Sequence, residues 1–123
     1  MLDRNTSPVG WYIGTYLIRF VELNDRNDDE DSRHRVWENT KLIKAKDLGH
    51  AYDELVKVAQ LEAQPYRGGP DGVPVQWVFE GVVELLPIYE ELENGAELMY
   101  KEHTHSKLKN LRKRVRNKKD FFE

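Results

Sequence analysis

The chain has 123 residues, a formal net charge of −3 and no cysteine. This length suits one domain, and 39% hydrophobic residues supply the material for a core. The lack of cysteine excludes disulfides, thiolate metal sites and cysteine catalysis. No run approaches the ~20 apolar residues of a transmembrane helix, and the first residues lack the apolar segment of a secretory signal. We therefore expect a cytoplasmic protein with no membrane partner.

The charge is divided unequally along the chain. Residues 1–100 carry ten Lys/Arg and nineteen Asp/Glu, a net charge of −9, whereas residues 101–123 carry nine and three, a net charge of +6. Such asymmetry suggests electrostatic partners. We expect a single α+β domain at residues 9–101, followed by a basic amphipathic helix or tail at 102–123.

Two strands are predicted before the first helix. Residues 11–23 are rich in aromatic and β-branched residues. One face of this strand carries Trp11, Ile13, Leu17, Val21 and Leu23, and the other carries Tyr12, Tyr16, Ile18 and Phe20. Because both faces are apolar, each should be covered, or one should be a binding surface. After a polar loop at 24–31, a second strand at 36–46 directs Val36, Thr40 and Leu42 to one side and Trp37, Ile43 and Ala45 to the other.

The remaining elements complete an α+β pattern. Asp47 is a suitable N-cap for a helix that runs to about Ala63, before Pro65. The Gly- and Pro-rich residues 64–74 predict a loop. A third strand at 75–86 has a bulge or a close backbone approach at Gly81 and places Trp77, Phe79, Val83 and Leu85 on one side.

A short helical turn at 87–93, a turn at Asn94-Gly95 and a fourth strand at 96–101 follow. The expected order is β-β-α-β-β: an antiparallel sheet of about four strands with one helix packed on a face, plus a C-terminal basic helix.

Several short signatures occur in a fixed order along residues 10–101. They are Trp11-Tyr12, Arg35 with Glu38-Asn39, Leu42-Ile43-Lys44-Ala45 leading into Ala51-Tyr52, Trp77-x-Phe79-x-Gly81, and Glu91-Leu92-Glu93-Asn94-Gly95-Ala96-Glu97. In their order and spacing the chain resembles a small bacterial family, domain-of-unknown-function family 4288. The resemblance implies a bacterial stand-alone domain with these boundaries, and it implies no activity.

The sequence favours neither a metal site nor an enzyme. His103 and His105 can chelate from one side of an extended segment, but His34 or His50 would have to join them by folding. The acidic residues 25–31 lack the central Gly and terminal Glu of a calcium loop. We expect no metal, no cofactor and no small-molecule substrate.

Catalytic motifs are also missing: there is no Gly-x-Ser-x-Gly, no phosphate loop and no His-Glu-x-x-His. One alternative brings Glu38, Glu80 and Glu84 together across neighbouring strands, where paired carboxylates can do acid–base work. Strand glutamates usually face solvent, so we expect no catalytic residues.

The basic tail is the clearest indication of a binding function in this sequence. Its cationic side chains are candidates for phosphate or acidic-partner contacts: Lys107, Lys109, Arg112, Lys113, Arg114, Arg116, Lys118 and Lys119. Leu108, Leu111 and Val115 form a narrow apolar stripe at i, i+3 and i+7. This helix can bind nucleic acid, or it can dock on the sheet or on a second copy of the chain. It can also lie against the acidic residues 1–100, which we call the acidic body, of its own chain or against an acidic partner.

The aromatic face of the first strand offers a related choice. Exposed Tyr12, Tyr16 and Phe20 would stack single-stranded bases, whereas buried ones would form core or a dimer interface. We take Tyr12, Tyr16, Phe20, Leu108, Leu111 and Val115 as candidates for an apolar interface. The leading hypothesis is a non-enzymatic protein-interaction or homo-oligomerising module, and the alternative is a nucleic-acid-binding accessory protein.

Overall fold

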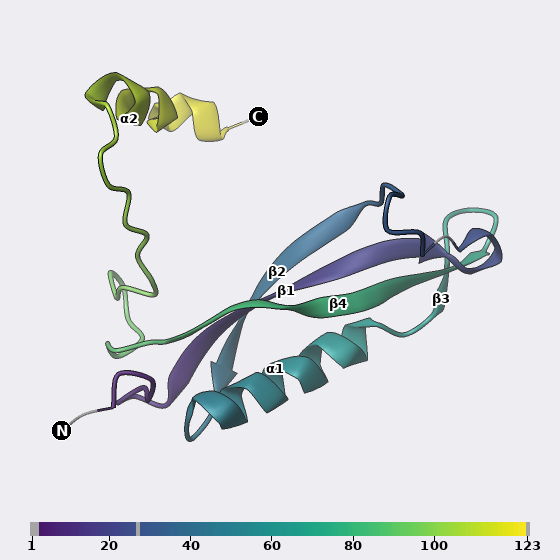
Figure 1. The fold of residues 1–123 in the computed structure, drawn as a ribbon, viewed down its shortest axis with the longest axis horizontal. Helices are drawn as coiled ribbons and strands as arrows, with labels where there is room; N and C mark the ends of the chain where they lie inside the picture. The colour runs from purple at the N-terminus through teal and green to yellow at the C-terminus, as the bar shows by residue number, and fades with distance from the viewer. Residues whose placement is uncertain (1–2, 27, 123) are drawn as a thin grey trace.

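A computed structural model of the chain describes residues 3–26 and 28–122 (Figure 1). Residue 27 of the predicted acidic loop, residue 123 of the predicted tail and the first two residues lie outside this part. The elements in chain order are β1 (Trp11–Glu22), a 3-10 turn (Leu23–Asp25), β2 (Val36–Lys44), α1 (Leu48–Glu62), β3 (Tyr66–Gly68), β4 (Val73–Pro87), α2 (Leu108–Arg114) and a second 3-10 turn (Lys118–Phe121).

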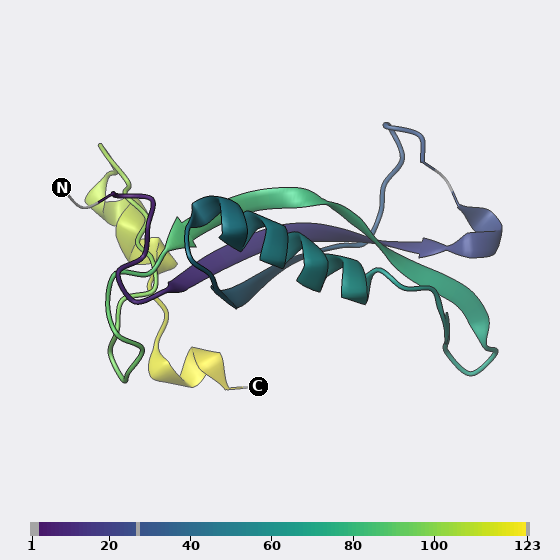
Figure 2. The ribbon, with the colours of Figure 1, turned by 90° about the horizontal axis from the view of Figure 1, so that it is seen from below.

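The four strands form one curled antiparallel sheet in the spatial order β2-β1-β4-β3. Helix α1 packs on one face of the sheet, as Figure 2 shows from below. The α+β class and the β-β-α-β-β order are thereby confirmed, together with a short helix near the C-terminus. No helix within residues 3–26 and 28–122 is long and apolar enough to cross a bilayer.

The core lies between β1 and α1. Tyr12, Tyr16 and Ile18 on β1 meet Leu55 and the small residues Ala51 and Ala59 on α1, and all of them are buried. The predicted start of the helix is confirmed, because the Asp47 side chain accepts a hydrogen bond from the backbone N–H of His50.

Strand β4 changes its side-chain phase near Gly81. The pairing of β4 with β1 shifts register twice, on either side of Gly81, whose φ of 154° suits a residue without a side chain. Val82 therefore packs against the core, while Val83 is 50% exposed. The bulge predicted at Gly81 is confirmed, and the simple alternation that placed Val83 beside Trp77 was wrong.

Three local predictions differ from the structure. The Gly-rich segment 64–74 contains β3, which pairs with the start of β4 through a turn in which Gly69 and Gly72 take positive φ. The sheet therefore gains its fourth strand from β3 and not from residues 96–101, which form no regular element. Residues 88–93 do not form the predicted helical turn. There, the N–H of Glu97 donates to the carboxylate of Glu90.

The tail helix is also shorter than predicted, since α2 covers only part of 106–119. Like charges spaced four residues apart, at Lys109 with Lys113 and at Arg112 with Arg116, disfavour a longer helix.

Candidate functional site

The face of the sheet opposite α1 is covered by no helix of the described chain (Figures 1 and 2). Strand pairing aligns Leu42 of β2, Ile13 of β1 and Leu86 of β4 across this open face. Ile13 is buried at the centre of this apolar row, while Leu42 at the sheet edge is 49% exposed. The open face is therefore the surface on which the domain has apolar area available for a partner.

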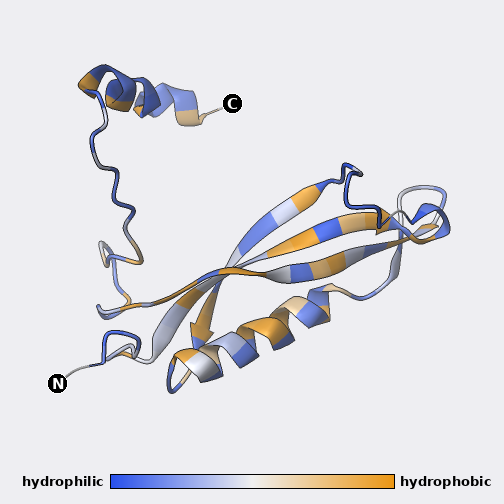
Figure 3. Ribbon diagram, in the orientation of Figure 1, coloured by the Kyte–Doolittle hydropathy of each residue, from blue (hydrophilic) through white to orange (hydrophobic). Residues whose placement is uncertain are grey.

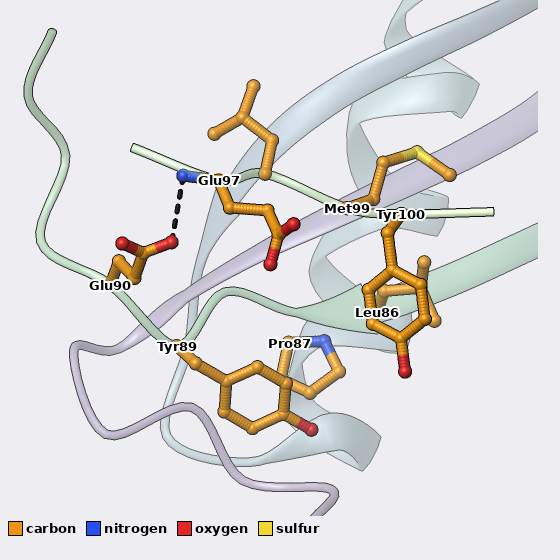
Figure 4. A pocket seen from close by; sticks show the side chains of 8 residues that line it. Leu86, Pro87, Tyr89, Glu90, Glu97, Met99 and Tyr100 are labelled. Atoms are coloured by element: carbon orange, nitrogen blue, oxygen red, sulfur yellow. Dashed lines mark hydrogen bonds between the residues drawn. The ribbon is translucent and has the colours of Figure 1, made fainter. Parts of the chain in front are cut away.

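A pocket of about 580 Å³ adjoins the apolar row at the end of β4 (Figure 4). We call it the end pocket. One wall is the end of β4 and the residues that follow it, and the other is the returning segment 97–100. The lining residues are Leu86, Pro87, Tyr89, Glu90, Glu97, Leu98, Met99 and Tyr100.

Hydrogen bonds from the N-terminal segment fix the first wall of the end pocket. The hydroxyl of Ser7 donates to the carbonyl of Ile88 and accepts from the backbone N–H groups of Val9 and Trp11. The N–H of Ile88 donates to the carbonyl of Trp11 at 2.9 Å. The Tyr89 hydroxyl donates to the carbonyl of Arg4. This wall is thereby tied to the start of β1 before any ligand arrives.

The chemistry of the end pocket is apolar with a negative charge inside it. Figure 4 shows the Glu97 carboxylate pointing into the space between the rings of Tyr89 and Tyr100. This carboxylate makes no ion pair with any residue that the structure describes. Apolar walls, two phenol rings and the carboxylates of Glu90 and Glu97 complement an apolar group that carries a cation.

A polar cleft of about 370 Å³ occupies the other end of the open face. Its centre is Arg19 of β1, whose guanidinium lies 2.9 Å from Asp28 and 3.2 Å from Glu80. Hydrogen bonds from Arg19 and Arg26 hold the pKa of Asp28 below its usual range. Within residues 3–26 and 28–122 no group of three or more His, Asp or Glu side chains could hold a metal ion. The acidic loop is thus tied to the sheet by arginine.

Two of the predicted interface residues belong to the core instead. Tyr12 and Tyr16 are fully buried beneath α1, so the prediction that they form an interface is corrected. Burial raises the pKa of Tyr16 to about 12, and the neighbouring Glu62 adds to the shift. Phe20 lies on the same face beyond the helix and packs edge-on against Trp77, with their ring centres 5.4 Å apart.

The tail keeps its predicted residues at the surface. The described residues from Lys101 onward are all exposed, and Figure 3 shows a mostly hydrophilic segment with a few apolar positions. None of the eight basic side chains forms an ion pair with a described carboxylate. The apolar stripe is equally uncovered but shorter than predicted, because α2 ends at Arg114 and Val115 follows it in an extended conformation, 78% exposed.

The remaining candidates do not come together. Glu38 lies on β2, whereas Glu80 and Glu84 lie on β4, and β1 runs between them. Two strand spacings correspond to about 9.5 Å, too far for a hydrogen-bonded carboxylate pair. His103 contacts Arg114 at 3.5 Å, in the exposed tail.

Two features escaped the reasoning from sequence. The ring centres of Trp37 and Trp77 lie 4.6 Å apart, beyond the end of α1, and Trp37 is 54% exposed. The signal for this pair was a tryptophan followed directly by the polar residues Glu38, Asn39 and Thr40. The end pocket had no local signal, because it depends on where residues 97–100 return beside β4.

These features define a small α+β domain in which a helix covers one face of the sheet. Its acidic body carries an exposed basic tail. Residues 11–100 match the model of a family described as "Domain of unknown function (DUF4288)", and the chain belongs to that family. Comparisons with curated proteins and with solved structures gave no match.

Proposed function

We propose that this protein is a non-enzymatic interaction module that associates with copies of itself. The observation that carries the proposal is the uncovered stripe of Leu108 and Leu111 on α2, followed by the exposed Val115, in a segment that is otherwise mostly basic. A seven-residue helix is marginal in water without packing, so this stripe requires a surface to cover it.

The complementary surface is present on the same chain. The end pocket combines apolar walls with the carboxylates of Glu90 and Glu97, and residues 1–100 carry a net charge of −9 against +6 for residues 101–123. The tail does not lie on its own body, because its described residues are exposed throughout. We therefore assign the contact to two copies, with the tail of one bound at the end pocket of the other. Opposite charges would speed their encounter.

Sedimentation velocity on the full chain tests this proposal with a matched pair of variants. Leu111→Asp places a charge in the stripe, and Asn110→Asp places the same charge beside it on α2. We expect the wild type and Asn110→Asp to sediment as a concentration-dependent oligomer and Leu111→Asp to shift towards the monomer. Equal behaviour of the two variants would remove the tail from the interface, and a wild type that stays monomeric would overturn the proposal.

One observation favours a second candidate function, nucleic-acid binding. The eight basic side chains of the tail are exposed and free of described carboxylates, as phosphate contacts require. Fluorescence anisotropy with labelled single- and double-stranded oligonucleotides, using the full chain and a 1–104 truncation, distinguishes the two candidates. Affinity that falls steeply with salt and is lost on truncation would support this second candidate.

A further inference from the structure

Strand β2 forms one edge of the sheet. It pairs with β1 alone, and two backbone hydrogen bonds fix which of its groups do so. The N–H of Phe20 donates to the carbonyl of Arg35 at 2.9 Å, and the N–H of Ala45 donates to the carbonyl of Gly10 at 3.0 Å. Because bonded and non-bonded pairs alternate in an antiparallel ladder, the odd-numbered residues of β2 bond to β1.

The even-numbered residues of β2 therefore direct their backbone groups away from the sheet. These residues are Val36, Glu38, Thr40, Leu42 and Lys44. Their outward N–H and C=O groups have no hydrogen-bond partner within residues 3–26 and 28–122. Five consecutive alternate residues thus present a ladder that a further strand can join.

Apart from the charge of Glu38, the usual protection of an edge strand is missing from β2. Natural edges are blocked by proline, by bulges or by lysines that reach outward. Strand β2 has no proline and pairs with β1 without a register shift. Both of its lysines turn to their own molecule: the ammonium of Lys41 lies 2.7 Å from Glu62, and that of Lys44 lies 5.5 Å from the ring centre of Trp11.

We propose that β2 of one copy pairs antiparallel with β2 of a second copy about a two-fold axis at Thr40. The inference rests on the self-association proposed above and adds an interface and a register to it. The two four-stranded sheets then join into one sheet of eight strands. A two-fold axis through that sheet places both α1 helices on one side and both open faces on the other.

The register follows from the outward groups. With Thr40 opposite Thr40 of the second copy, Glu38 pairs with Leu42 and Val36 pairs with Lys44, so all five outward residues are used. No like charges face each other across this register, which would otherwise cost stability. A shift of the axis by one residue to Asn39 leaves Lys44 without a bonded partner. On the helix side, the exposed ring of Trp37 comes opposite Ile43 of the second copy.

Disulfide trapping on the full chain tests the register, because the protein has no cysteine of its own. Thr40→Cys brings two thiols together at a Cα separation of about 5.5 Å, within the range that a disulfide spans. Val36→Cys is the matched control on the same edge. Its two thiols would lie eight residues apart along the strand, about 26 Å. We expect Thr40→Cys to form a covalent dimer at least about tenfold faster than Val36→Cys, because proximity raises the effective thiol concentration.

A second variant breaks the outward ladder while keeping the backbone hydrogen bonds between β2 and β1. Thr40→Pro removes an N–H that points outward, so the circular dichroism spectrum should be unchanged while sedimentation shifts towards smaller species. If the wild type is oligomeric but Thr40→Cys cross-links no faster than Val36→Cys, edge pairing is wrong and self-association stands. If the wild type is monomeric at every concentration tested, edge pairing and the proposed function both fail.

Discussion

Gly14 of β1 lies directly beneath Leu55 of α1, so that a Cβ placed on Gly14 would come within 2.4 Å of the Leu55 Cδ2 atom. Leu55 is fully buried and has little room to move. The absence of a side chain at position 14 thus sets how closely the helix approaches the sheet.

We expect Gly14→Ala to lower the free energy of unfolding by about 1–3 kcal/mol, because an extra methyl group in a packed core forces its neighbours off their rotamers. The control is Gly49→Ala in the first turn of α1, where the nearest atom to the new Cβ is 3.6 Å away. That change should stabilise the helix by roughly 0.5–1 kcal/mol. Urea unfolding of both variants checks the pair; a Gly14→Ala protein as stable as the wild type would contradict the close approach.

Tyr16 predicts an alkaline limit to stability. Burial raises its pKa from 10.0 to about 12, so between these values the unfolded chain releases a proton that the folded chain keeps. The free energy of unfolding should therefore fall as the pH rises from 10 to 12, by roughly 2 kcal/mol. Tyr16→Phe removes this dependence.

The same variant also removes a buried hydroxyl that lies near Glu62 and Asn39 but makes no hydrogen bond of standard geometry with a described residue. Near neutral pH it should therefore be neutral or more stable than the wild type by about 1 kcal/mol. Chemical unfolding of both proteins at several pH values gives both answers, and a destabilised Tyr16→Phe at pH 7 would show that the hydroxyl is bonded after all.

Local signals were enough to predict much of this fold. The aromatic strand β1, the Asp47 cap of α1 and the bulge at Gly81 each depend on a few neighbouring residues. The side-chain phase of β4 just beyond Gly81 was not predictable, because one register shift brings Val82 to the core in place of Val83 and a second shift restores the predicted phase at Leu85. The hairpin between β3 and β4 was missed since its glycines resemble those of an open loop.

The candidate site was less accessible to reasoning from sequence. The two apolar faces of β1 predicted cover on each side or a binding surface on one, but they did not indicate which face α1 takes. That choice is tertiary, and it turned Tyr12 and Tyr16 from interface candidates into core. The end pocket joins residues 86–90 to residues 97–100 through a return that no local pattern encodes.

Proline substitutions should distinguish the residues of β2 whose N–H groups bond to β1 from those whose N–H groups point outward. The N–H of Asn39 bonds to β1 in the alternation that Arg35 and Ala45 establish, whereas the N–H of Thr40 points outward. We expect Asn39→Pro to lower the free energy of unfolding by about 2 kcal/mol or more, through the lost ladder bond. Thr40→Pro should cost the monomer about 1 kcal/mol, for its hydroxyl contact with Thr15. Thermal unfolding at low protein concentration compares them, and equal losses would show that the assignment of outward groups is wrong.

The carboxylates of the end pocket should govern the salt dependence of self-association. Replacing Glu90 and Glu97 by glutamine keeps their shape and an acceptor oxygen but removes the charge that would meet the basic tail. We expect the double variant to dissociate about tenfold more readily at low salt, which corresponds to about 1.4 kcal/mol. At high salt it should approach the wild type, because screening weakens exposed charge pairs. The control is the double change Glu91→Gln and Glu93→Gln, which removes the same charge from nearby residues outside the pocket. Sedimentation equilibrium at two salt concentrations measures the association of both double variants. Equal weakening by the two would contradict a specific contact, because the tail would then respond only to the net charge of residues 1–100.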